Sequence, residues 1–296
     1  MPFSSTRSSL LSLVLLLTGC PAAETAGGKD PSGEETGGAE PKCDEGLTET
    51  LGGLAFASIC PGTFEMGCTA GQGELCEFSE NLHTVTLTHG YWMKVTEVTH
   101  AEFAAVTGLS PSYFDCGDAC PVENVTWHMA AAYANALSAA EGLTQCYDCT
   151  GEDAAVSCVE TGDPYACPGY RLPTDAEWER AARCEEDTMF AGSDTLDEVG
   201  WYETNAGDAP RPVATLAPNR CGVYDMSGNI GEWVQDAWNP ELAGATDPYW
   251  GTLENYRTAR LGNFADSYLT SRVAARWPYD PTTDNGGIGI RIVRLW

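Results

Sequence analysis

Cysteine is the residue type that most constrains how this chain can fold. The 296 residues include 13 cysteines, and none follows Cys221. In an exported protein such a number favours disulfides, whereas in an intracellular protein it favours metal sites or reactive thiols. The N-terminus must therefore be interpreted before the cysteines.

The first 20 residues have the pattern of a cleaved export signal. Arg7 precedes an apolar run at 10–17 that is too short to span a bilayer. The following Leu17-Thr18-Gly19-Cys20 segment resembles the lipobox of bacterial lipoproteins, which implies cleavage after residue 19 and acylation of Cys20. The alternative is an ordinary secretory peptide that happens to contain a cysteine. We therefore expect residues 1–19 to be a lipoprotein signal peptide and the protein to be lipid-anchored in the bacterial cell envelope, at the outer membrane.

Removal of Cys20 leaves twelve cysteines, an even number that fits up to six disulfides. Zinc is the alternative, because Cys116-x3-Cys120 and Cys146-x2-Cys149 have ligand-like spacing. The export signal favours disulfides, and a redox role for the second pair lacks the expected βαβ context. The disulfide candidates are Cys43, Cys60, Cys68, Cys76, Cys116, Cys120, Cys146, Cys149, Cys158, Cys167, Cys184 and Cys221.

Charge and composition exclude some partners and fold classes. With 43 acidic and 15 basic residues the chain has a net charge of -28, which excludes nucleic acid and docking on anionic lipid through a basic patch. The 32 glycines and 17 prolines disfavour a helical bundle. Residues 20–42 lack aromatic side chains and are predicted as the acylated cysteine and a flexible tether. The remainder, 43–296, is predicted as one domain.

Local signals predict a few short elements. Thr-x-x-Glu capping boxes begin at Thr99 and Thr174 and predict a helix after each. Thr126 is predicted to cap a third helix. Strands are expected at 84–87 and 288–293.

Six segments in a fixed order resemble one protein family. They are GTFEMG at 62–67, EVT at 97–99, PVENVTW at 121–127, RLPTDAEWERAAR at 171–183, YDMSGNIGEW at 224–233 and GIGIR at 287–291. Together they resemble the formylglycine-generating enzyme (sulfatase-modifying factor) family. The resemblance implies an α+β, C-type-lectin-like fold, loop-rich with short strands and few helices.

The same resemblance implies calcium in many members. The YDMSGNIGEW segment is similar to a calcium loop, which implies Asn229, Ile230 and Glu232 as ligands of the metal. Calcium takes about six to eight oxygen ligands. The alternative is that Asn229 holds a tight turn through hydrogen bonds from its side chain to the backbone.

The best-known activity of the family uses two cysteines that hold copper. The resemblance places Tyr268 and Val273 at the cysteine positions, and the sequence offers no later cysteine in their place. A soft Cu(I) ion needs thiolate ligands, which neither valine nor tyrosine provides. No catalytic residue is assigned, and copper is not expected.

Five residues fall where the resemblance places a ligand groove: Asp266, Tyr268, Arg272, Arg276 and Trp277. Arginine and aromatic side chains can anchor a peptide or a sugar, although structural ion pairs are the alternative for the arginines. The expected function is binding of a peptide, a glycan or an envelope protein by a lipoprotein. The alternative is an oxidoreductase of the formylglycine-generating type, acting on a protein cysteine or thiol through a different metal arrangement.

Overall fold

The computed structural model describes residues 43–69, 72, 75–251, 256–260 and 262–296. The predicted signal peptide, Cys20 and the tether lie outside these residues. Within them, short helices and many short strands are joined by long irregular segments, which is the expected loop-rich α+β fold. None of the helices described is long and apolar enough to cross a membrane.

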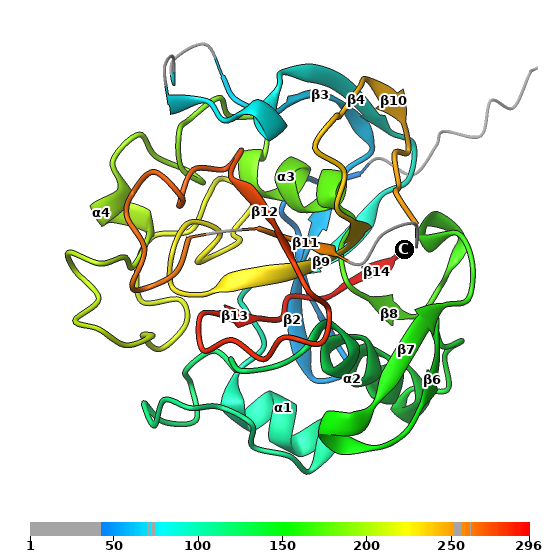
Figure 1. Ribbon diagram of the computed structural model, residues 1–296. Helices are drawn as coiled ribbons and strands as arrows, with labels where there is room; N and C mark the ends of the chain where they lie inside the picture. Colours follow the sequence, from blue (N-terminus) through cyan, green and yellow to red (C-terminus); the bar gives the residue numbers. More distant parts are fainter. Residues whose placement is uncertain (1–42, 70–71, 73–74, 252–255, 261) are drawn as a thin grey trace, which may run out of the picture. The chain divides into compact units, whose positions relative to one another are not determined.

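Figure 1 shows how the elements are arranged. The α-helices are α1 (His100–Thr107), α2 (Trp127–Ala140), α3 (Asp175–Arg183) and α4 (Leu196–Val199). The strands are β1 (Thr48–Leu51), β2 (Leu54–Ile59), β3 (Gly62–Met66), β4 (His83–Leu87), β5 (Tyr91–Lys94), β6 (Tyr147–Thr150), β7 (Ser157–Glu160), β8 (Tyr170–Arg171), β9 (Gly231–Ala237), β10 (Ala245–Thr246), β11 (Arg257–Arg260), β12 (Arg276–Tyr279), β13 (Ile288–Gly289) and β14 (Val293–Leu295).

The strands form four small sheets. Their orders are β1-β2-β5-β14-β8, β12-β11-β9-β13, β10-β4-β3 and β6-β7. Helix α2 packs on β6, β7 and β8, whereas α3 packs on β3, β4 and β9. Two apolar cores result, one around Trp127 and Trp233 and the other around Trp178 and Tyr91.

The three predicted helix starts are confirmed. The Thr99 Oγ1 accepts a hydrogen bond from the Glu102 N–H at 3.3 Å. Thr126 does the same for the Met129 N–H at 3.1 Å, and Thr174 caps α3 within a complete capping box. Each hydroxyl satisfies an N–H that the helix itself leaves unbonded, so a local sequence pattern is enough to fix these boundaries.

The predicted strand at 84–87 is confirmed as β4, but the strand predicted at 288–293 is wrong in one respect. It is two strands in different sheets: β13 pairs with β9, and β14 pairs with β5 and β8. Between them, Arg291 turns its side chain into the core and contacts Glu232 at 2.7 Å. A run that looks continuous in the sequence is therefore divided by a long-range ion pair.

The predicted disulfides are confirmed, because all twelve cysteines of the domain are paired. The pairs are Cys43–Cys60, Cys68–Cys76, Cys116–Cys120, Cys146–Cys167, Cys149–Cys158 and Cys184–Cys221. Cys146 and Cys149 have different partners, so they do not form a redox pair with each other. None of the twelve is left as a thiolate for zinc.

Candidate functional site

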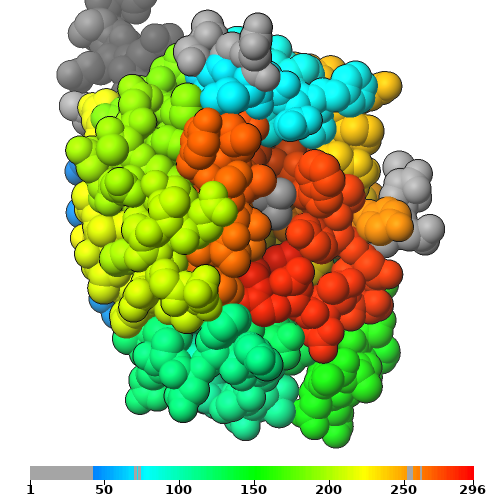
Figure 2. Space-filling view, turned by 60° about the vertical axis from the view of Figure 1, so that its left-hand side comes forward, coloured from blue at the N-terminus to red at the C-terminus, as the bar shows by residue number. Residues whose placement is uncertain are grey.

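A depression of about 510 Å³ opens where three segments far apart in the sequence meet. They are the loop at 113–124, the loop at 263–266 after β11, and residues 279–287 between β12 and β13. Figure 2 shows these segments side by side on one face, in teal, orange and red. The fold thus assembles the site from positions about 160 residues apart in the chain.

Aromatic rings form much of the wall. The rings of Phe114 and Phe264 meet edge to face, with centroids 4.9 Å apart. Tyr113 packs on Phe114 and is 79% exposed, and Tyr279 also lines the depression. Rings fixed by such contacts present apolar area at little entropic cost, so this wall is suited to contact a ligand.

Amide side chains shape the turns that carry the polar groups. Asn263 Nδ2 donates to Asp266 Oδ2 at 2.6 Å, and Asn285 Oδ1 accepts the Gly287 N–H at 2.8 Å. A Cβ atom at Gly287 would lie 2.8 Å from Asn263 Nδ2. A side chain at residue 287 would therefore displace the amide that orients Asp266.

Two carboxyl groups lie in or beneath the depression. Burial raises the pKa of Asp266, which is half-buried, above its usual value. Glu123 is buried behind Gly286; its Oε1 accepts the Phe114 N–H at 2.9 Å, and burial raises its pKa as well. Its Oε2 has no hydrogen-bond partner in the described part of the chain. Since no described residue lining the depression is basic, a neutral or cationic group suits the site better than an anion.

The structure separates the five predicted groove residues. Asp266 lines the depression. Arg272 instead binds both oxygens of Glu80, at 2.7 and 2.9 Å, and Arg276 lies 2.7 Å from an oxygen of Asp175. Both arginines are 3% exposed. Their charges are used inside the protein, as the structural alternative expects, so neither faces a groove.

The other two groove candidates lie outside the depression, and so does Val273, which stands at one of the family's two cysteine positions. Tyr268 and Trp277 are 46% and 51% exposed, outside the depression. Val273 is fully buried; its N–H donates to the Met189 carbonyl, and its carbonyl accepts from Arg260, both at 3.0 Å. The side chain of Val273 therefore belongs to the core and faces no ligand.

Comparison with known proteins decides the family. Residues 52–295 match the family profile described as the sulfatase-modifying factor enzyme 1-like domain. The chain belongs to this family. The formylglycine-generating enzyme of Streptomyces coelicolor is 31% identical to it over 272 residues, which are 78% of this chain and 86% of that protein.

The chain is also similar to proteins with other names. The chaperone protein LppX of Paenibacillus barcinonensis is 34% identical over 242 residues, 71% of this chain and 81% of that protein. The solved structure of Treponema denticola variable protein 1 is 29% identical, with a TM-score of 0.72 over 84% of this chain and 98% of that one. PvdO from Pseudomonas aeruginosa has a TM-score of 0.70 at 20% identity, covers 86% of this chain and 100% of its own, and shows the fold alone.

Of the three calcium ligands implied by the sulfatase-modifying factor resemblance, Asn229 and Glu232 have side-chain oxygens, and these already have partners. Ile230 is buried and could offer only its backbone carbonyl. Asn229 Oδ1 accepts the Arg211 N–H at 2.9 Å, and its Nδ2 donates to the Arg211 carbonyl at 3.2 Å. Both Glu232 oxygens accept from Arg291, and one also accepts from Trp178 Nε1 at 2.6 Å. The Asn229 side chain thus joins its loop to a segment 18 residues earlier, instead of bonding within its own turn as the alternative expects. Calcium binding stays a prediction.

Sequence reasoning missed most of the depression. The Asp-Asn-Gly-Gly turn at 284–287 was a local signal that could have been used. The aromatic wall gave none, because Phe114 and Phe264 meet through the fold alone.

Proposed function

We propose that this protein is a lipoprotein of the bacterial cell envelope whose domain binds a peptide segment of a partner protein in the depression around Asp266. The observation that carries the proposal concerns cysteine. The twelve cysteines of the domain are joined in disulfides, and none follows Cys221 in the sequence. Without a thiolate pair, the copper chemistry of formylglycine-generating members has no ligands here.

The lining of the depression supports a peptide ligand. Peptides present both N–H donors and apolar side chains, and the depression offers carboxyl and amide oxygens beside aromatic rings. The half-buried carboxyl of Asp266 can accept an N–H or a cationic group. A relative whose name is that of a chaperone gives further support for a protein partner over a glycan.

The partner can be sought by photocrosslinking in the native envelope. A benzoylphenylalanine in place of Tyr113, which lines the depression, should form adducts of defined mass that Asp266→Ala abolishes. The same probe at Leu47, which is 48% exposed and does not line the depression, is the matched control. Equal adducts at both positions, or none at residue 113, would count against the proposal, and adducts with polysaccharide would replace the peptide by a glycan.

The lipid anchor needs a test of its own. In cells fed a clickable palmitate, the wild-type chain should be labelled and should sediment with outer membranes, whereas Cys20→Ala should be unlabelled. A wild-type chain that carries no lipid would refute the anchor but leave the binding proposal standing.

Copper loading separates binding from oxidation. Purified protein should bind no stoichiometric Cu(I) and should consume no oxygen with a cysteine-containing peptide. Turnover in this assay would refute a pure binding role and establish the oxidoreductase alternative.

A further inference from the structure

We propose a second docking surface, independent of the depression: the free edge of β3 and the groove beside it bind an extended, lysine- or arginine-bearing segment of a partner protein. Strand β3 is the last strand of the β10-β4-β3 sheet and pairs with β4 alone. A groove of about 720 Å³ runs beside it. In the described part of the chain, the backbone of 62–66 makes no hydrogen bond outside this pairing.

An open strand edge is a template for another strand. Its unpaired N–H and C=O groups can bond an extended peptide, a mode known as β-augmentation. Native edges are commonly blocked by proline or by a bulge, and the edge strand β12 contains Pro278. Strand β3 contains no proline between Gly62 and Met66, and its pairing with β4 is regular. Nothing in the sequence of β3 blocks this edge.

The groove has an apolar part that alternate side chains of an added strand can use. Phe64 and Leu82 line it, and Leu82 is 49% exposed. Thr63 and Glu65 alternate with Phe64, are exposed, and bond Thr86 and Thr84 of β4 at 2.8 and 2.7 Å. A strand added to β3 would therefore bring every second side chain to the apolar part and the others to the charged rim.

The charges of the groove define the partner. Glu65, Glu185, Glu186 and Asp187 line it together with two arginines. Each arginine is shared between two carboxylates: Arg180 lies 3.4 Å from Glu45 and 3.8 Å from Glu185, and Arg183 lies 2.8 Å from Glu179 and 3.3 Å from Asp187. Glu185 and Asp187 thus have arginine partners, whereas Glu65 and Glu186 make no ion pair in the described part of the chain and leave the rim with excess negative charge. A basic segment is complementary to this rim.

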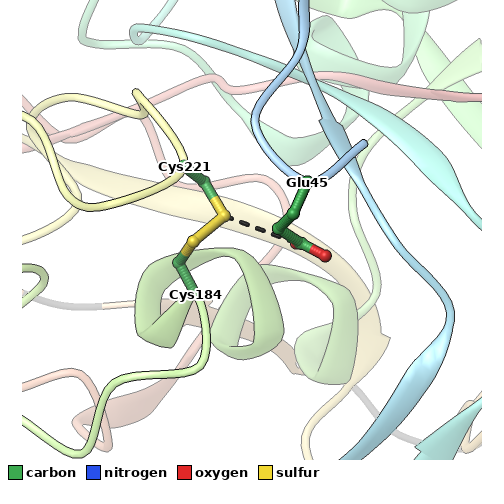
Figure 3. A group of neighbouring side chains, drawn as sticks. All are labelled: Glu45, Cys184 and Cys221. Carbon is green, nitrogen blue, oxygen red and sulfur yellow. Dashed lines mark hydrogen bonds between the residues drawn. A yellow bond between two sulfur atoms is a disulfide. The ribbon is translucent and has the colours of Figure 1, made fainter. Parts of the chain in front are cut away.

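The far wall of the groove is held in place covalently. The Cys184–Cys221 disulfide fixes the end of α3, from which 185–187 continue along the groove. Glu45 lies against this disulfide, with its Oε1 3.4 Å from the Cys221 Sγ (Figure 3). The Nε of Arg180, 4% exposed, has no acceptor among the described residues.

The chain's own N-terminal tether is a poorer occupant of the same groove. Residues 21–42 contain five acidic residues and two lysines. Like charge on the rim and on the tether disfavours their contact. A basic segment from another protein is therefore the occupant that the charges select.

The experiment uses the full chain and a fluorescein-labelled peptide of alternating lysine and valine, ten residues long. Fluorescence anisotropy should show saturable binding that weakens with added salt, and a matched glutamate–valine peptide should not bind. Hydrogen exchange should show new protection of residues 61–67 in the complex, which mere charge attraction would not produce. Absence of that protection, despite binding, would overturn the docking site.

Matched variants test the rim. Glu65→Gln with Glu186→Gln removes two carboxylates that make no ion pair in the described part of the chain, and should weaken binding about fivefold. Glu49→Gln with Glu241→Gln makes the same charge change at exposed sites outside the groove and should weaken it less than twofold. An equal loss of peptide affinity in the two double variants would overturn the site. Asp266→Asn should leave this binding unchanged, so failure here is distinguishable from failure of the proposed function.

Discussion

Replacing Arg272 by methionine tests whether this arginine stabilises the core or serves a ligand. Its guanidinium donates to both oxygens of Glu80, and the two residues are 3% and 2% exposed. Methionine has an apolar side chain of similar length but leaves the Glu80 carboxylate buried without a cation. Removal of one partner of a buried ion pair costs about 3–5 kcal/mol. In a domain of this size, 1 kcal/mol lowers Tm by about 2–4 °C, so we expect a fall of about 10 °C.

Thermal melts followed by circular dichroism measure the effect. Trp277→Ala, at a side chain 51% exposed, is the surface control and should change stability by less than about 0.5 kcal/mol. Adding Glu80→Gln to Arg272→Met removes the uncompensated charge and should recover part of the loss. The reasoning is refuted if Arg272→Met melts within about 2 °C of the wild type, because Arg272 would then contribute too little to the core to be confined there.

Three further outcomes are expected. Burial raises the pKa of Asp225 to about 6 and that of Glu97 well above its usual range. The folded protein therefore keeps protons that the unfolded chain releases above about pH 4. The stability from these groups is complete below about pH 4 and is lost as the pH rises through about 6. Glu97→Gln should flatten this fall in the free energy of unfolding, measured by urea titration at several pH values, and an unchanged dependence on pH would contradict the prediction. Melts in calcium and in chelator should agree if Asn229 serves only to bond the Arg211 backbone, whereas a rise of several degrees with calcium would establish a metal. Thiol titration of the unfolded, unreduced chain should find none of the twelve domain cysteines reactive; several reactive thiols would revive zinc.

Helix starts could be predicted because their causes are local. Thr99 and Thr174 each bond an N–H three residues ahead, so a four-residue window contains the whole interaction. The count of disulfides was also predictable, since parity and compartment decide it. Their connectivity was not: Cys184 pairs with a cysteine 37 residues away, and only the fold brings the two together.

The candidate site depended on contacts of longer range. The family resemblance placed Arg272 and Arg276 in a ligand groove, with structural ion pairs as the alternative. Glu80 and Asp175, which pair with them, lie about 100 to 190 residues earlier in the chain. Asp266 alone of the five predicted groove residues lines the depression. Residue type thus indicates what a side chain can bind, whereas burial decides whether a ligand can reach it.

Most basic residues of the described chain lie inside the domain, where an equal number of buried acidic residues offsets them, so the net negative charge lies on the surface. Nine of the twelve basic side chains among the described residues are buried, namely Lys94, Arg171, Arg180, Arg183, Arg257, Arg260, Arg272, Arg276 and Arg291. Most of them neutralise carboxylates inside the domain. Few cations therefore remain to offset the exposed carboxylates, and the surface field attracts cationic partners and repels anionic ones. Both proposed binding surfaces lie within that field. A basic protein segment therefore fits this domain better than a phosphate-bearing ligand or an anionic polysaccharide. Binding of such a segment should weaken as salt is added.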